Sequence, residues 1–81
     1  MQGLTSKEVT HLMGNGKDVF MVHKNWMMDG IPSLEESVKD SILGLFDSEE
    51  SGIEFASKLP GYQEGKYVVS RLEFPIELQA E

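Results

Sequence analysis

The segment DSEESGIE, residues 47–54, carries four carboxylates in eight positions. Carboxylates at this density could bind calcium in a twelve-residue loop, which also needs glycine at position 6 and a bidentate glutamate at position 12. With Asp47 at position 1, Gly52 falls at position 6, but Lys58 takes position 12. Because a lysine there would repel the ion, the segment instead predicts the first turn of a helix, where carboxylates meet the positive end of the helix dipole.

The other reactive residue types show no spacing that fits a catalytic or metal site. His11 and His23 are the only histidines, and the chain has no cysteine. A zinc site needs more ligands than these at closer spacing. The serines form no Gly-x-Ser-x-Gly elbow, and the glycines follow no phosphate-loop spacing. We therefore expect no metal, no cofactor and no catalytic activity.

The segment NWMMDGIP, residues 25–32, places large apolar residues in a predicted loop. Asp29-Gly30 is a strong turn pair, and Pro32 disfavours a helical conformation at the residue before it. Tryptophan is a common interface hot spot, and methionine adapts to irregular surfaces. These apolar residues therefore predict either a protein-binding loop or a segment that folds back to cover a small core.

The elements that must position these residues begin with a helix over residues 4–13. Thr5 and Glu8 form a capping-box pair at its start, and the glycines after residue 13 end it. The run Val19–Val22 is β-prone and too short for a convincing helix, so it predicts the first strand.

The stretch that follows is ambiguous between helix and strand. Capping residues and apolar spacing favour a helix near residues 33–38, whereas ILGLF favours a strand, which we place at residues 40–46. Asp47 or Ser48 then caps a second helix, which ends at the Pro-Gly pair of residues 60–61. Three of its residues should face the sheet: Ile53, Ala56 and Leu59.

The C-terminal stretch from residue 66 onward alternates with period two. Arg71, Glu73 and Glu77 fall on one face, and the opposite face is apolar except at Ser70. Its apolar residues are Val68, Leu72, Phe74, Ile76 and Leu78. Pro75 lacks an N–H to donate, so this long strand should lie at a sheet edge or be bulged there. The prediction is an α+β fold with a small antiparallel sheet of about three strands and one or two helices packed on one face.

Three motifs within residues 19–74 resemble a family of small uncharacterised bacterial and phage domains. They are a strand that ends in histidine, VFMVH; a glycine-containing strand followed by an acidic helix start, ILGLFDSEES; and a Leu-Pro-Gly-Tyr turn before the last strand, LPGYQEGKYVVSRLEF. The resemblance implies a strand-strand-helix-strand unit. It brings no catalytic residues and no activity.

Length and charge narrow the classes of partner. The 81 residues predict a single domain, 1–81, that buries only about 60 to 65 per cent of its unfolded surface. Residues 29–64 hold nine acids against two lysines, which accounts for the whole net charge of −7. This charge disfavours duplex DNA and anionic membranes and favours a basic protein partner. No stretch has the length of a membrane span, and the start lacks the features of a secretory signal, so we expect a cytoplasmic protein.

The sequence therefore predicts a small acidic, non-catalytic protein-binding module. An inhibitor or immunity-type protein that acts on a basic or nucleic-acid-processing partner would have these properties. Its expected binding residues are Trp26, Met27, Met28, Ile31, Glu35, Glu36, Asp47, Glu49, Glu50 and Glu54. Two alternatives stay open. One is a small-molecule-sensing regulatory domain with a pocket near His23, Tyr62 and Tyr67; the other is a structural subunit that forms a homodimer through a strand edge.

Overall fold

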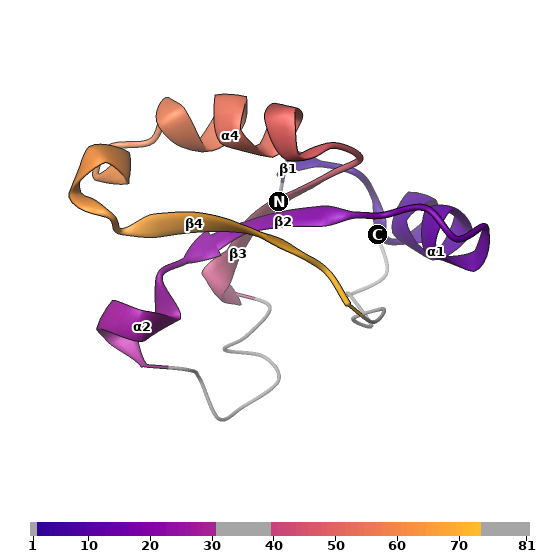
Figure 1. Cartoon of the computed structure of the whole chain (residues 1–81), viewed down its shortest axis with the longest axis horizontal. Helices are drawn as coiled ribbons and strands as arrows, with labels where there is room; N and C mark the ends of the chain where they lie inside the picture. The colour runs from indigo at the N-terminus through magenta and orange to yellow at the C-terminus, as the bar shows by residue number, and fades with distance from the viewer. Residues whose placement is uncertain (1, 31–39, 74–81) are drawn as a thin grey trace.

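A computed structural model describes residues 2–30 and 40–73 of the chain, which form a mixed sheet with helices around it (Figure 1). The strands are β1 (Gln2–Gly3), β2 (Phe20–Lys24), β3 (Ile42–Phe46) and β4 (Tyr67–Arg71), in the sheet order β1-β3-β2-β4. β1 is parallel to β3, and the other neighbouring pairs are antiparallel. The helical elements are α1 (Ser6–Gly14), α2 (Trp26–Asp29), α4 (Glu49–Ser57) and the 3-10 helix η1 (Tyr62–Glu64). The predicted α+β class is confirmed.

The first described residues add a strand beyond the three that the sequence indicates. Gln2 pairs with Gly44 and Gly3 with Leu45, and the N–H of Leu4 donates to the Leu45 carbonyl at 2.7 Å. A two-residue strand is too short to show any alternation of apolar and polar residues, which is why the sequence pattern cannot reveal it. Its parallel pairing makes the sheet mixed.

α4 lies over one face of the sheet, above β2, β3 and β4 in Figure 1. Ser48 is its N-cap, and the Ser48 hydroxyl accepts a hydrogen bond from the backbone N–H of Ser51 at 3.1 Å. Glu49 and Glu50 occupy the first turn. The acidic segment is therefore a capped helix start, as predicted.

The inward face of α4 differs from the predicted one. Ala56 is buried as expected and Leu59 is half-buried, but Ile53 is 42 % exposed, and the residue that faces the sheet beside Ala56 is Gly52. A Cβ atom on Gly52 would lie 3.0 Å from Cγ1 of Val69. α4 approaches the sheet closely because this position has no side chain, and the prediction for Ile53 is wrong.

α1 begins as predicted, with a complete capping box. The Thr5 hydroxyl accepts from the N–H of Glu8 at 3.2 Å, and the Glu8 carboxylate accepts from the N–H of Thr5 at 2.9 Å. One buried residue of α1, Val9, packs into the core. The buried core residues around it are Val19, Ile42, Leu45 and Leu72.

This core lies on the sheet face opposite α4. Val22 and Gly44 are paired across β2 and β3, and Val22 faces α4, so Met21 and Leu45, one residue along, face the other way. α1 packs there at the end of the sheet (Figure 1). The two longer helices thus contact opposite faces and do not share the single face that we expected.

The segment that precedes β3 differs from the predicted strand over residues 40–46. Asp40 and Ser41 are helical, and the strand starts at Ile42. The pairing with β2 shifts between Val22 and His23, which leaves Leu43 as the extra residue of a bulge. The bulge turns Ile42 toward the core, a change of face that strict alternation does not predict. The helix or turn predicted near residues 33–38 lies outside the described residues.

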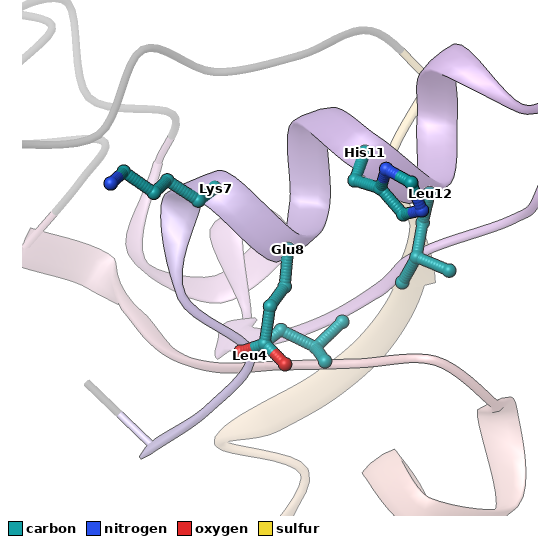
Figure 2. Close-up of a pocket in the computed structure, with 5 residues that line it drawn as sticks. All are labelled: Leu4, Lys7, Glu8, His11 and Leu12. Atoms are coloured by element: carbon teal, nitrogen blue, oxygen red, sulfur yellow. The ribbon is translucent and has the colours of Figure 1, made fainter.

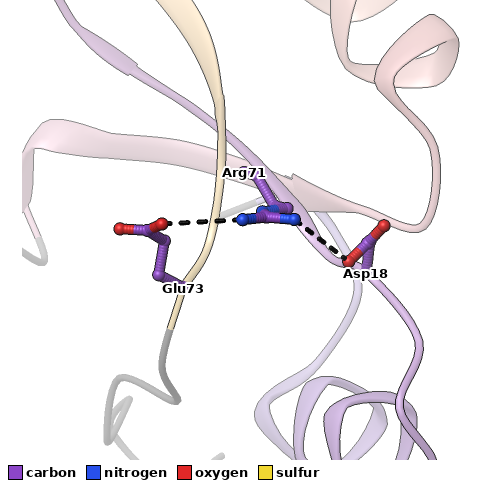
Figure 3. Close-up of polar contacts among 3 residues, drawn as sticks. All are labelled: Asp18, Arg71 and Glu73. Carbon is purple, nitrogen blue, oxygen red and sulfur yellow. Dashed lines mark ion pairs between the residues drawn. The ribbon is translucent and has the colours of Figure 1, made fainter.

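β4 is the edge strand of the described sheet, as predicted from Pro75, although Pro75 itself lies outside the described residues. After Arg71 the chain continues to Leu72, which is buried and donates its N–H to the Val19 carbonyl at 2.7 Å. The last part of the predicted strand, with Phe74, Ile76 and Leu78, also lies outside the described residues. Arg71 reaches Asp18 at 4.0 Å and Glu73 at 3.6 Å in exposed ion pairs (Figure 3).

Candidate protein-binding surface and the network beneath it

The segment predicted as the binding loop is a one-turn helix. Asn25 caps α2 by accepting a hydrogen bond from the Met27 N–H at 3.0 Å, and the N–H of Gly30 donates to the Trp26 carbonyl at 2.8 Å. The turn pair Asp29-Gly30 ends this helix, with φ +85° at Gly30. The prediction of a loop over residues 25–30 is therefore wrong in its local structure, because asparagine is a strong N-cap and four residues are too few for helical periodicity to show.

Asn25 also connects α2 to the segment that precedes β4, at the same end of the sheet. Its side-chain amide donates to the Gly65 carbonyl at 2.7 Å, and its backbone N–H donates to the Lys66 carbonyl at 2.9 Å. Gly65 and Lys66 lie between η1 and β4. One residue thus caps α2 and fixes its start to a neighbouring segment that is 40 residues away in sequence.

Trp26 anchors α2 to the sheet. Its ring lies against the imidazole of His23, with 4.1 Å between ring centroids and 32° between ring planes. Its indole Nε1–H donates to the Ser41 hydroxyl at 3.1 Å. Trp26 is half-buried and contacts the sheet, as the interpretation of a segment that folds back predicts, and the protein-binding interpretation stays a prediction.

His23 is buried beneath this anchor, at 4 % exposure. Its Nδ1 lies 2.7 Å from the carbonyl oxygen of Lys24, which can only accept, so Nδ1 carries the proton. In the neutral ring Nε2 then accepts from the Ser70 hydroxyl, at 2.9 Å. Burial lowers the pKa of the His23 imidazole below its ordinary value, and the hydrogen bond to the Lys24 carbonyl offsets part of that change.

Ser70 is the signal by which sequence reasoning could have found this network. It interrupts the apolar face of β4, and a serine in such a position requires a polar partner from the neighbouring strand. β2 pairs antiparallel with β4, His23 opposite Val68, which places the His23 ring diagonally beside Ser70. Ser41, the second hydroxyl of the network, has no comparable signal, because no local pattern indicates that its partner is Trp26, fifteen residues away.

The methionines of α2 are the most exposed large apolar side chains described. Met27 is 95 % exposed and Met28 is 61 % exposed, whereas Trp26 beside them is anchored. Ile31, the fourth apolar residue of the predicted surface, lies outside the described residues. A fixed turn that carries two solvent-facing methionines is a preorganised apolar surface, because its backbone needs no further ordering when a partner binds.

The acidic residues of the predicted surface that the structure describes are not adjacent to these methionines. The carboxylates of α4 and the residue before it are exposed: Asp47, Glu49, Glu50 and Glu54. α4 covers one face of the sheet, whereas His23 and the Trp26 ring lie on the opposite face, so α2 and α4 are on opposite sides (Figure 1). Glu35 and Glu36 lie outside the described residues. The described carboxylates of α4 and the methionines of α2 therefore form two separate surfaces.

An open groove of about 280 Å³ runs along α1 and includes no residue of α2 or α4 in its lining (Figure 2). It is lined by Leu4, Lys7, Glu8, His11 and Leu12. Glu8 is already engaged in the capping box, and His11 is exposed. The groove is open and slightly smaller than the usual ligand pocket.

The described residues hold no cluster of three His, Asp or Glu side chains that could bind a metal ion. His23 presents neither ring nitrogen to a ligand, because both are hydrogen bonded inside the fold. Tyr62 and Tyr67, the other residues of the alternative sensing pocket, are half-buried. The edge position of β4 is where a homodimer would pair, and that alternative also stays a prediction.

No protein-family model, no curated protein and no solved structure matches the chain. The resemblance to small bacterial and phage domains therefore stays a prediction. Among the residues that the structure describes, no helix combines the length and apolar character needed to cross a membrane.

Proposed function

We propose that the protein is a small acidic, non-catalytic module that binds a basic protein partner in the cytoplasm, in the manner of an inhibitor or immunity-type protein. The observation that carries this proposal is the exposure of Met27 and Met28 on a turn that Trp26 and Asn25 hold in place. Two large apolar side chains exposed next to each other on one turn favour a surface that a partner covers. Methionine also suits a surface that adapts to a partner's shape.

The two separated surfaces would act in different ways. The α2 methionines would supply the contacts that slow dissociation, and the α4 carboxylates would raise the association rate with a positively charged partner from the other side. A basic partner is favoured because the net charge of −7 arises entirely within residues 29–64. A nucleic-acid-processing protein is one class with the required charge.

The test compares wild type with the double variant Met27→Gln/Met28→Gln. Each methionine that becomes buried at an interface contributes about 1.5 to 3 kcal/mol. We therefore expect the double variant to lose its partner, with Kd raised roughly a hundred-fold or more. Partners captured from a lysate are identified by mass spectrometry, purified, and their affinity is then measured by calorimetry.

Ile53→Gln provides the matched control, because Ile53 is also exposed and apolar but lies on α4. It should leave Kd unchanged. The variant Glu49→Lys/Glu50→Lys should lower the association rate and its dependence on salt, with little change in the dissociation rate. Equal affinity of the wild type and the double methionine variant for the purified partner would show that α2 is not the binding surface.

A further inference from the structure

We propose that the contact between His23 and Trp26 is a pH-sensitive latch that holds α2 on the sheet and releases it in acid. The inference deepens the proposed function, on which its biological meaning rests, because α2 carries Met27 and Met28. Neutral conditions would present the methionines in a fixed position. Acid would free the turn and weaken binding.

α2 depends on its side-chain contacts for its position. A four-residue helix forms too few internal hydrogen bonds to be stable alone. Trp26 supplies the stack on His23 and the hydrogen bond to Ser41, and Asn25 secures only the start of the turn. When the Trp26 ring leaves the sheet, the residues that follow it lose their fixed orientation.

A second proton on His23 disturbs this arrangement at a defined atom. Nδ1–H already donates to the Lys24 carbonyl, so the new proton must sit on Nε2, which faces the Ser70 hydroxyl. Ser70 then has to accept where it previously donated, and its own hydrogen needs another acceptor. The ring becomes a buried cation, and although the face of Trp26 attracts a cation, burial of the charge opposes it.

The described side chains that face His23 offer this cation no counter-charge. Opposite the ring are Ile42 on β3 and Val68 on β4, with Ser70 diagonal to it and Trp26 stacked on it. The other ionisable residues of β2 and β4 lie on the face that α4 covers, because side chains alternate along a strand. They are Lys24, Tyr67 and Arg71. Asp40 is exposed beside Ser41, and Asp29 is the last residue of α2. Burial among described side chains that place no carboxylate against the ring disfavours the imidazolium.

The direction of the pH effect follows from the lowered pKa of His23. The released ring binds a proton more readily than the latched ring, so the latch is fully stable above about pH 6.5 and weakens as the pH falls below that value. Each unit by which latching lowers the pKa changes the ratio of released to latched protein by roughly ten-fold.

The experiment uses the only tryptophan of the chain as its reporter. Trp26 emission and its quenching by acrylamide are measured from pH 8 to pH 4, with the full chain and no partner. In wild type we expect a red shift and stronger quenching with a midpoint below about 6.5. His11→Gln removes the exposed histidine and should behave like wild type, whereas His23→Gln should show no transition in this range.

Far-UV circular dichroism over the same range separates local release from unfolding. The proposal expects α1, α4 and the sheet to keep their signal through the fluorescence midpoint. Loss of that signal at the same midpoint would show acid unfolding of the whole domain and would overturn the latch. So would a fluorescence transition in His23→Gln that matches wild type.

A second measurement does not depend on whether His23→Gln folds. Nuclear magnetic resonance of wild type follows the imidazole C–H of His23, assigned with the help of His11→Gln, together with the indole N–H of Trp26. The indole signal should move and exchange faster with the same midpoint at which His23 titrates. An indole signal that stays constant while His23 takes up its proton overturns the latch. None of these readouts involves a partner, so failure of the latch and failure of the binding proposal are distinguishable.

Discussion

At the scale of single residues, two glycines set the distances at which other elements approach the sheet. Gly52 lets α4 rest on Val69, and Gly44 lets β1 pass beside β3. A Cβ on Gly44 would lie 3.2 Å from the Gln2 carbonyl oxygen and 2.8 Å from a ring carbon of Phe46. Neither glycine has positive φ, so close packing, and not backbone conformation, explains them.

Gly44→Ala should therefore destabilise the protein by about 1 to 3 kcal/mol, the usual cost of an added group in a packed site. The backbone of β1 and the Phe46 ring would both have to move. Gly14→Ala is the control, because no atom lies within 4 Å of its Cβ position and it ends α1. The control should change the free energy of unfolding by less than about 1 kcal/mol, in the stabilising direction. Urea unfolding of both variants measures the difference, and equal stabilities would refute the packing argument.

How far single residues could be predicted depends on whether their partners are near in sequence. Thr5 with Glu8, and Ser48 before the acidic turn, were recognisable because each cap acts on a backbone group three residues away. The burial of Gly52 was not recognisable, since it depends on a contact with Val69, which is distant in sequence. The His23–Ser70 pair is intermediate, because only the interrupted apolar face of β4 indicated it.

At the scale of elements, the cap of α4 makes a separable contribution to stability. The Ser48 hydroxyl accepts the Ser51 N–H and donates to the Ser51 hydroxyl at 2.9 Å. Glu49 and Glu50 follow in the first turn, where the helix dipole favours them. α4 covers one face of the sheet, so fraying of its first turn would uncover that face.

Ser48→Ala should lower the free energy of unfolding by about 0.5 to 2 kcal/mol through loss of the cap. Ser57→Ala is the matched control at the other end of α4. The Ser57 hydroxyl is exposed and donates to the Glu54 carbonyl at 2.9 Å, a bond that water replaces readily. Removal of the Ser57 hydroxyl should change the free energy of unfolding by less than about 0.5 kcal/mol. The two variants are compared by thermal and urea unfolding; an equal loss in both would show that the Ser48 cap has no special role.

Elements were predictable where they were long enough to repeat a pattern. α1, β2, β3, α4 and β4 were all expected in this order, from caps, β-prone runs and alternation. β1 and α2 were not expected, because two strand residues and four helical residues cover about one period each, and a single period shows no repeat. The bulge at Leu43 and the packing of α1 and α4 on opposite faces depend on contacts between elements, which the local pattern does not contain.

At the scale of the whole molecule, repulsion among negative charges exceeds the attraction in the described ion pairs. The chain carries 14 acidic and 7 basic residues. The described ion pairs link Lys66 to Glu64 at 3.3 Å and Arg71 to Asp18 and Glu73, and all are exposed. Exposed pairs contribute little to stability, so the uneven charge mainly opposes the compact state.

Added sodium chloride should therefore stabilise the protein. Screening shortens the range of repulsion from about 30 Å at 0.01 M salt to about 3 Å at 1 M. We expect the free energy of unfolding in urea to rise by about 1 kcal/mol over this range, the scale of a few exposed charge interactions. Glu54→Gln removes one exposed carboxylate of α4 beyond its first turn and should reduce this dependence on salt. A free energy of unfolding that falls as salt is added would contradict this prediction. It would show that the exposed ion pairs stabilise the fold more than the repulsion among the carboxylates destabilises it.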